Sequence, residues 1–405
     1  MPQTSSRRPA LRGLVTRGFS LTMGASMAAG MIFMMQAPLL HKASSFEPAL
    51  AQLSSHATTP IDWPSMGSAA LVIPALGVQR TYHSEVLPIA SLTKMMTAYV
   101  TLEKLPLNPG ETGPCVIINA GDVANYVTIT AQGQSSAAVA LGERLCEDQL
   151  LSGLLVHSAG NFGTILANLV WGGTANFVAH MNADAQLLGL RSTHYADVTG
   201  IGSGSVSTAL DQGELAATIM KFAEVRAIVD QPTVTLPVAG TLNSFTPFVG
   251  LDNVVGVKSG RTDAAGGCDV MAMNFSFRGQ SELAYAVVLG ARGGDLLGPA
   301  GNEALALEHS VLDSQHSTEI PAGTVVGTIG WDNERVNVVT ELHVTLDYLT
   351  ALNGANVQVS VVPQSGPIQA GEVIGWLTVD DGTHTRVPLT VVHRLAPLTL
   401  LQRVA

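Results

Sequence analysis

The sequence is poor in cysteine, in aromatic residues and in charge, and each shortage excludes a class of protein. Three cysteines among 405 residues are too few for a disulfide scaffold, and they lack the spacing of a metal site. The 11 histidines form no H-E-x-x-H motif and no cluster with cysteine, so we expect no metal centre. Charged residues make up 13% of the chain and hydrophobic residues 46%, which favours a folded protein with a large core over a disordered one.

Basic residues are also scarce, and they are unevenly placed. The chain holds 20 lysines and arginines against 31 aspartates and glutamates. Residues 1–51 contain five of the basic groups and one of the acidic groups, so 15 basic and 30 acidic groups remain and the rest of the chain carries a net charge of −15. An acidic surface repels phosphate backbones, and we therefore expect no nucleic-acid partner.

The N-terminus has the pattern of a targeting segment. Arginines precede an uncharged stretch of 24 residues from Gly18 to His41. A spanning helix needs about 20 residues and a cleaved signal only roughly 7–15 apolar ones, so the length favours a signal anchor. The small residues of Ala49-Leu50-Ala51 favour cleavage instead, and both alternatives stay open. We expect residues 1–51 to be a signal peptide or signal anchor with linker, and the body to be extracytoplasmic, either secreted or held at the membrane by this segment.

The sequence pattern of the rest of the chain changes near residue 317. Apolar residues recur at helical spacing from Leu92 to Tyr99 and predict a helix over Ile89–Leu105. Further helices are expected over 147–167, 174–190, 208–225 and 302–314, and strands over 253–258, 267–277 and 283–290. Later runs are short, β-branched and separated by turn residues, which predicts a small β-sandwich or barrel. The predicted domains are residues 52–310 and 318–405.

Ser91-Leu92-Thr93-Lys94 opens the first predicted helix and places a hydroxyl beside an amine. Positions i and i+3 share one helix face, roughly 5–6 Å apart at Cβ. A serine hydroxyl is a poor nucleophile until a base removes its proton, and a partly buried lysine is such a base because desolvation disfavours its charged form. The neighbouring residues are apolar, so we interpret Ser91 as nucleophile and Lys94 as base. The common alternative is a helix cap beside a surface charge.

Two further segments carry polar side chains at the ends of apolar runs. In Ser158-Ala159-Gly160-Asn161, a polar turn interrupts a predicted helix. In Lys258-Ser259-Gly260-Arg261-Thr262, a strand carries a cation and a hydroxyl, and its glycine leaves room for a ligand backbone to approach. Taken singly, each segment is equally typical of a helix kink or of a strand that ends in a turn.

The order and spacing of the three segments are more specific than any one of them. Ser158 follows Ser91 by 67 residues, and Lys258 follows Ser158 by 100. This arrangement resembles the S-x-x-K, S-x-N and K-T-G motifs of penicillin-recognising serine enzymes. Flanking segments such as Pro88–Ala98 are similar to the D-alanyl-D-alanine carboxypeptidase family, peptidase family S11, over about residues 66–310. The resemblance implies an α+β, β-lactamase/transpeptidase-like fold: an antiparallel sheet with helices on both faces and an all-helical subdomain, followed by a small C-terminal all-β domain.

The same resemblance implies catalytic roles. Ser91 would attack the carbonyl between the two terminal D-alanines of a peptidoglycan stem peptide while Lys94 takes its proton. Ser158 would relay a proton toward the leaving amine, and water would then release the acyl group. β-Lactam antibiotics would acylate the same serine, and no cofactor is required.

Substrate-binding residues follow from the resemblance as well. The predicted set is Lys258, Ser259, Gly260, Arg261, Thr262 and Asn161. Lys258 and Ser259 would hold the terminal carboxylate, and the backbone N–H groups of Ser91 and Arg261 would form the oxyanion hole. A disulfide between Cys115 and Cys146 is implied too, because the family pairs these segments as neighbouring strands.

One position departs from the family pattern. The third residue of the S-x-N motif is Gly160, and asparagine follows one place later at Asn161. A shift of one residue in a helix turns a side chain by about 100°, so Asn161 takes over that role only if the turn at Gly160 is loosened. The leading hypothesis is a D-Ala-D-Ala carboxypeptidase, and the alternative is a catalytically weak peptidoglycan- or β-lactam-binding protein. A class A β-lactamase is the least favoured, because no Glu-x-x-x-Asn sequence lies between the second and third motifs.

Overall fold

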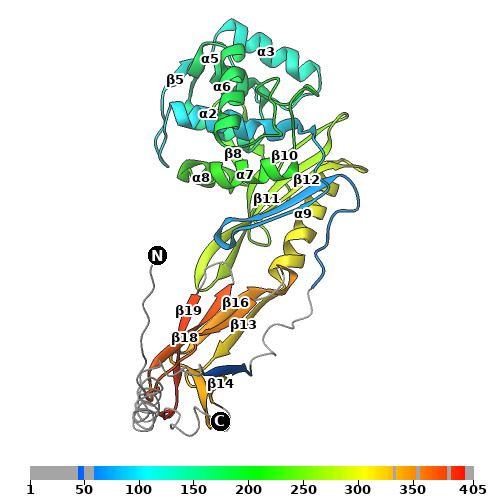
Figure 1. Ribbon diagram of the computed structural model, residues 1–405. Coiled ribbons are helices and arrows are strands. Elements are labelled where there is room, and N and C mark those ends of the chain that lie inside the picture. Colours follow the sequence, from blue (N-terminus) through cyan, green and yellow to red (C-terminus); the bar gives the residue numbers. More distant parts are fainter. Residues whose placement is uncertain (1–43, 50–58, 332–333, 353–355, 381–384, 397–405) are drawn as a thin grey trace, which may run out of the picture.

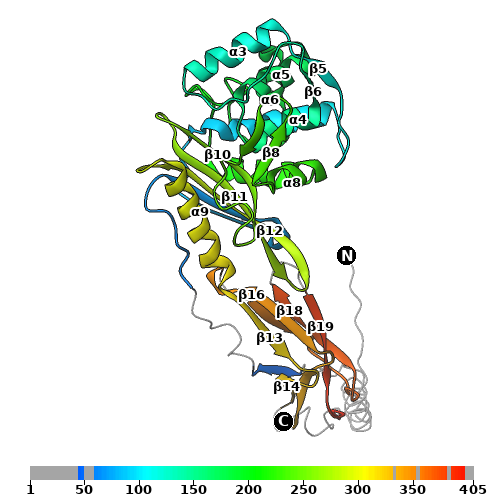
Figure 2. The ribbon, with the colours of Figure 1, turned by 180° about the vertical axis from the view of Figure 1, so that it is seen from behind.

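The computed structural model describes residues 44–49, 59–331, 334–352, 356–380 and 385–396. These residues form an elongated molecule with a helical part at one end, an antiparallel sheet in the middle and an all-β part at the other end (Figure 1). The view from behind in Figure 2 shows the same order along the long axis. This is the α+β arrangement that the sequence predicts.

A five-stranded antiparallel sheet forms the centre, with the strand order β10-β11-β12-β2-β3. Its strands are β2 (Ser68–Ile73), β3 (Val78–Tyr82), β10 (Val254–Thr262), β11 (Gly266–Phe277) and β12 (Gln280–Ala291). Successive residues of a strand point to opposite faces, and in β11 both faces are covered. Cys268, Val270 and Ala272 pack with the helical part, whereas Met271 and Met273 pack against α9 (Leu297–Leu312). The burial of both faces explains why these strands read as continuous apolar runs.

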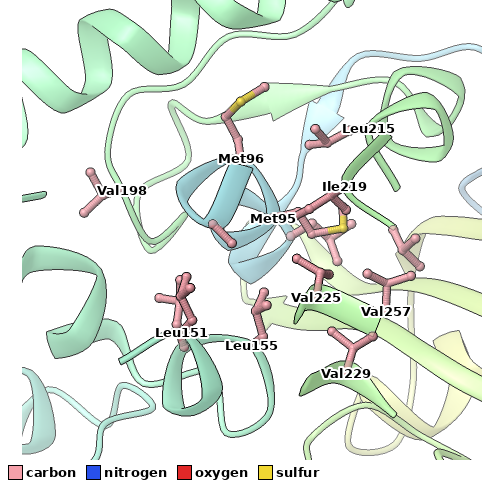
Figure 3. Close-up of a cluster of buried hydrophobic side chains, with 14 of the residues drawn as sticks. Met95, Met96, Leu151, Leu155, Val198, Leu215, Ile219, Val225, Val229 and Val257 are labelled. Atoms are coloured by element: carbon pink, nitrogen blue, oxygen red, sulfur yellow. The ribbon is translucent and has the colours of Figure 1, made fainter. Parts of the chain in front are cut away.

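Helices lie on both faces of the sheet, with α9 on one side and α7 (Ala209–Ile219) on the other. The other helices are α2 (Thr93–Lys104), α3 (Ala120–Ala131), α4 (Glu147–Leu155), α5 (Gly160–Trp171), α6 (Thr174–Leu187) and α8 (Ala223–Val229). Helix α2 is central to this part, because nine of its 12 residues are buried. Figure 3 shows Met95 of α2 beside Ile219 of α7, with Leu151 and Leu155 of α4 below α2. Such close packing holds the first turn of α2 in one position.

The segments that connect these helices and strands contain short 3₁₀ turns and two-stranded sheets. They are η1 (Pro74–Leu76), η2 (Ala90–Leu92), β4 (Leu87–Pro88) with β7 (Val206–Ser207), β5 (Cys115–Ile117) with β6 (Arg144–Cys146), and β8 (Thr233–Leu236) with β9 (Gly240–Asn243). Cys115 lies opposite Cys146 in the β5–β6 pair, and a disulfide joins the two sulfur atoms. Cys268 is a buried free thiol.

The C-terminal part is a β domain with a core of its own. One sheet has the order β1-β14-β15-β19-β18-β17, and β13 pairs with β16 beside it. The bounds are β13 (Gln315–Ile320), β14 (Val325–Trp331), β15 (Glu334–Thr340), β16 (Val344–Leu349), η3 (Thr350–Leu352), β17 (Asn356–Val361), β18 (Val373–Asp380) and β19 (Thr385–Val391). Ile329, Leu377 and Leu389, which are completely buried, belong to this core. None of the residues described in this domain lines the hollows of the candidate active site.

The sheet of the β domain includes a strand from the beginning of the chain. Strand β1 (Ser45–Pro48) pairs with β14 in antiparallel register. Arg335 of β15 fastens it, since one guanidinium nitrogen lies 3.3 Å from the Glu47 carboxylate and donates to Ser45 Oγ at 3.1 Å. Cleavage after Ala51 would therefore remove an edge strand from this sheet. The predicted targeting stretch itself lies outside the described residues, and no helix among those described is long and apolar enough to cross a membrane.

Candidate active site

Ser91 lies in the 3₁₀ turn η2, which leads directly into α2. Its neighbours Ala90 and Leu92 are buried, whereas Ser91 is partly exposed. Lys94 follows one turn later, and its Nζ donates a hydrogen bond to Ser91 Oγ at 2.7 Å. The candidate nucleophile and the candidate base are therefore in direct contact.

The surroundings of Lys94 favour its neutral form. The side chain is 3% exposed, and Nζ also donates to the Thr199 carbonyl at 3.0 Å. Burial lowers the pKa of Lys94 to about 7, although the Asp197 carboxylate acts in the opposite direction. A large share of Lys94 is therefore unprotonated near pH 7 and able to accept the proton of Ser91.

Two adjoining hollows open beside Ser91. The first is lined by Ser91, Ser135, Ser158, Phe245, Ser259, Gly260, Arg261 and Leu297. The second is lined by Ser91, Lys94, Gly133, Gln134, Ser135, Gly160, Thr199, Ile201 and Arg261. Ser91, Ser135 and Arg261 line both, so the two hollows meet at the candidate nucleophile.

Ser158 lies in the tight turn between α4 and α5. Its φ of 60° falls in the left-handed region, which a residue other than glycine seldom adopts. The side chain is 3% exposed, and its Oγ has no hydrogen-bond partner among the described residues. Leaving a buried hydroxyl unpaired costs about 1–3 kcal/mol, and a ligand in the first hollow can supply the missing partner.

Strand β10 forms the wall opposite Ser158. Gly260 lies so close to Ser91 that a Cβ at this position would be 2.6 Å from the Ser91 nitrogen, and only glycine permits this approach. Ser259 lines the first hollow, and its Oγ donates to the Phe245 carbonyl at 2.7 Å. Arg261 brings a guanidinium group to both hollows and is anchored by a 2.8 Å hydrogen bond to the Asp295 carbonyl.

Lys258 lies behind this wall, and it does not line either hollow. The side chain is fully buried, and Nζ donates to the Ser259 carbonyl at 2.8 Å. Burial and the nearby charge of Lys94 hold the pKa of Lys258 well below its usual range, while Asp269 acts in the opposite direction. The Lys258 amine thus supports the backbone of Ser259, which lines the first hollow, and its contact with a substrate carboxylate stays a prediction.

Two other members of the predicted binding set also lie away from the hollows. Asn161 is fully buried, and its amide both donates to the Ala137 carbonyl at 2.8 Å and accepts from the Ala137 N–H at 3.0 Å. Thr262 Oγ1 accepts from the Ala265 N–H at 3.0 Å within the β10–β11 turn. Both side chains support neighbouring backbone in this structure, and their contact with the substrate stays a prediction.

Gly160, and not Asn161, faces the second hollow. It is the first residue of α5, and its N–H donates to the Ser135 carbonyl at 2.9 Å. A Cβ at Gly160 would lie 3.3 Å from that carbonyl, so a side chain fits here with a small adjustment. Sequence reasoning missed Ser135 and Thr199, because neither belongs to a recognisable motif. Among the residues described, no group of three or more His, Cys, Asp or Glu is placed to hold a metal ion.

The class of protein follows from this geometry. An antiparallel sheet whose edge strand faces a serine–lysine pair at the start of a buried helix defines the serine hydrolases of the penicillin-binding fold. The sequence model of peptidase family S11, described as D-alanyl-D-alanine carboxypeptidase, matches residues 79–293. The chain therefore belongs to this family, and the resemblance noted in the sequence is confirmed.

Known proteins similar to this chain agree with that assignment. D-alanyl-D-alanine endopeptidase of Escherichia coli K12 is 29% identical over 243 residues, which cover 56% of this chain and 73% of the relative. A protein of the same name from Pseudomonas aeruginosa is 31% identical over 199 residues, 46% of this chain and 59% of the relative. Penicillin binding protein 6B from Escherichia coli superimposes with a TM-score of 0.58 at 21% identity, covering 86% of this chain and 99% of that one. This last likeness shows the shared fold.

Proposed function

We propose that the protein is a serine-type D-Ala-D-Ala carboxypeptidase that removes the terminal D-alanine from peptidoglycan stem peptides. The observation that carries the proposal is the 2.7 Å contact between Lys94 Nζ and Ser91 Oγ, at a lysine whose pKa burial lowers to about 7. This contact pairs a nucleophile with a base beside two open hollows. Membership of the S11 family supports the substrate class.

In the proposed acylation step, neutral Lys94 takes the hydroxyl proton of Ser91 while Oγ attacks the carbonyl carbon of the terminal peptide bond. The backbone N–H groups of Ser91 and Arg261 stabilise the oxyanion. The Lys94 ammonium then gives its proton to Ser158 Oγ as Ser158 passes its own hydroxyl proton to the nitrogen of the leaving D-alanine, so Lys94 is neutral again. The unpaired, buried hydroxyl of Ser158 supports this role. Water then attacks the ester, and Ser91 recovers its proton as the shortened peptide leaves.

The substrate's terminal carboxylate would lie against β10. Arg261 and Ser259 line the first hollow: Arg261 offers a positive charge, and the Ser259 hydroxyl would turn from the Phe245 carbonyl to donate to the carboxylate. The buried amine of Lys258 lies directly behind them. A free C-terminal carboxylate is thus the feature that we expect this site to select.

The test is to incubate the protein with an N-acylated peptide that ends in D-Ala-D-Ala and to measure the D-alanine released. We expect steady release, together with a stable covalent adduct when penicillin is added instead. Rapid hydrolysis of penicillin without a lasting adduct would indicate a β-lactamase. If neither D-alanine nor an adduct forms on long incubation, the enzymatic proposals fail.

Gly160 favours a second candidate function, in which the protein binds peptidoglycan or β-lactams but turns over slowly. The family pattern has an asparagine amide at this position, whereas the second hollow here is lined by a bare glycine. The amide of Asn161 does not compensate, because it is fully buried, bonds the Ala137 backbone and does not line the hollow. The missing hydrogen bond to the substrate would weaken acylation.

Replacing Gly160 with asparagine should therefore raise the acylation rate. One hydrogen bond contributes about 1 kcal/mol, which corresponds to roughly a fivefold to tenfold increase. The rate of penicillin adduct formation measures the effect by intact mass. Gly160→Ala is the matched control: it fills the same Cβ space without an amide and should give no increase. A fall in rate for Gly160→Asn would show that the open hollow itself is needed.

We also infer that the protein works in the extracytoplasmic cell envelope. Residues 1–51 carry the pattern of a signal peptide or signal anchor, and a peptidoglycan substrate lies outside the cytoplasmic membrane. The segment would either be removed on export or hold the protein at the membrane.

A further inference from the structure

We propose that Asp197 is a positioning residue for the base Lys94: it fixes the turn whose carbonyl accepts from the amine, and it supplies a negative charge in the surroundings of that amine. The inference rests on the proposed role of Lys94 as the base for Ser91. Neither the sequence motifs nor the walls of the two hollows include Asp197.

The carboxylate of Asp197 closes the turn that follows it. Oδ1 accepts hydrogen bonds from the Thr199 N–H at 2.7 Å and from Thr199 Oγ1 at 2.9 Å, and it also accepts from the Gly200 N–H. Oδ2 lies 3.4 Å from the Gly202 nitrogen, which donates to it. Four donors thus converge on one side chain. A short acidic residue that accepts from the backbone two and three places ahead is an efficient device for holding a turn.

The turn that Asp197 closes contacts helix α2, which carries Lys94. Thr97 Oγ1 donates to the Val198 carbonyl at 2.8 Å, and Lys94 Nζ donates to the next carbonyl, that of Thr199, at 3.0 Å. Gly200 comes so close to the carbonyl of Ala90 that a Cβ could not fit, and its φ of +77° suits glycine. The turn that Asp197 closes therefore sets the position of the Thr199 carbonyl. That carbonyl in turn holds Lys94 Nζ in its orientation toward Ser91.

The charge of Asp197 matters because basic side chains also lie near Lys94. Lys258 interacts unfavourably with Lys94, and Arg261 lines the same hollow as Lys94. Asp197 raises the pKa of Lys94 against the effect of burial. When Lys94 takes the proton of Ser91 it becomes an ammonium ion, and the carboxylate stabilises that ion at the moment it forms.

The test compares Asp197→Asn with the wild-type protein across pH. Asparagine keeps an oxygen that can accept from the Thr199 and Gly200 N–H groups but removes the charge. We expect the pH midpoint of penicillin acylation to fall by about one unit, because the loss of an opposite charge lowers the pKa of an amine. Asp197→Ala should also release the turn and reduce the limiting acylation rate at least about tenfold. Asp122→Asn is the matched control, since Asp122 accepts from the Asn119 N–H in α3 and lines neither hollow.

The outcomes separate this inference from the proposed function. An unchanged midpoint in Asp197→Asn, or an equal shift in Asp122→Asn, would overturn the role of Asp197 while leaving acylation of Ser91 intact. Failure of the wild-type protein to acylate would instead contradict the proposed function. In that case NMR titration of the Lys94 amine in both proteins still decides the question, with a lower pKa in Asp197→Asn as the supporting result. If Asp197→Asn does not fold, Asp197→Ser keeps a short acceptor without charge and takes its place.

Discussion

Replacing Ser91 with alanine should abolish both the penicillin adduct and the release of D-alanine. The oxygen of the hydroxyl at this position would form the ester, and among the described residues the Lys94 amine has no other hydroxyl as a hydrogen-bond partner. Loss of a nucleophile typically costs about a thousandfold or more in rate. Intact mass after incubation with penicillin measures the adduct, and an assay for free D-alanine measures turnover. An alanine side chain fits the turn at Ser91, so the variant should keep its thermal stability.

The matched control for this prediction is Ser135→Ala. Ser135 lines both hollows beside Ser91, but the bond it makes to Gly160 comes from its backbone carbonyl and survives the substitution. The control protein should still form an adduct, at a rate within a few fold of the wild type. An adduct of the same mass in Ser91→Ala would show that another nucleophile is acylated, and it would remove the basis of the proposed mechanism.

The parts of the site that the sequence predicts are those carried by regular secondary structure. Ser91 and Lys94 are three residues apart at the start of a helix, so helical geometry alone brings them together. Ser259 and Gly260 lie on strand β10, whose apolar pattern is clear in the sequence. The pairing of β10 with β11 fixes this strand in the sheet, where Gly260 lies against Ser91. The helix over Ala120–Ala131 was not expected, although Asn119 and Asp122 form a capping box that marks its beginning.

Positions that depend on how loops lie could not be predicted in the same way. The sequence places Asn161 beside Ser158, yet the first turn of α5 directs the Asn161 amide to the Ala137 backbone and leaves Gly160 facing the hollow. Asp197 and Thr199 belong to an irregular turn about 100 residues from Lys94. The hydrogen bond from Lys94 to the Thr199 carbonyl depends on tertiary packing, which no local sequence pattern encodes. The strand β1, which joins the C-terminal sheet, is unpredictable for the same reason, because its partner β14 lies far along the chain.

Replacing Lys94 with methionine should lower the acylation rate by about a hundredfold to ten-thousandfold, which is the range that a general base contributes. Methionine preserves the length of the side chain but cannot accept a proton. In the wild-type protein the active species is the unprotonated amine, so the rate should rise with pH, pass its midpoint near 7 and then level off. The residual activity of Lys94→Met should lack this midpoint. Rates of penicillin adduct formation between pH 5 and 9 measure both effects.

Stability provides the check that Lys94→Met acts on chemistry rather than on folding. Burial lowers the pKa of Lys94, so the folded state binds this proton less tightly than the unfolded state, and the lysine opposes folding most strongly at low pH. Methionine carries no charge, so it removes the free-energy cost of burying a protonated amine. The variant should therefore unfold at an equal or higher temperature than the wild type near pH 6. Lys104→Met is the matched control, because Lys104 ends the same helix, is exposed and lies over the Trp171 ring instead of near Ser91. It should leave the pH midpoint in place. A midpoint that persists in Lys94→Met would assign the base to another group.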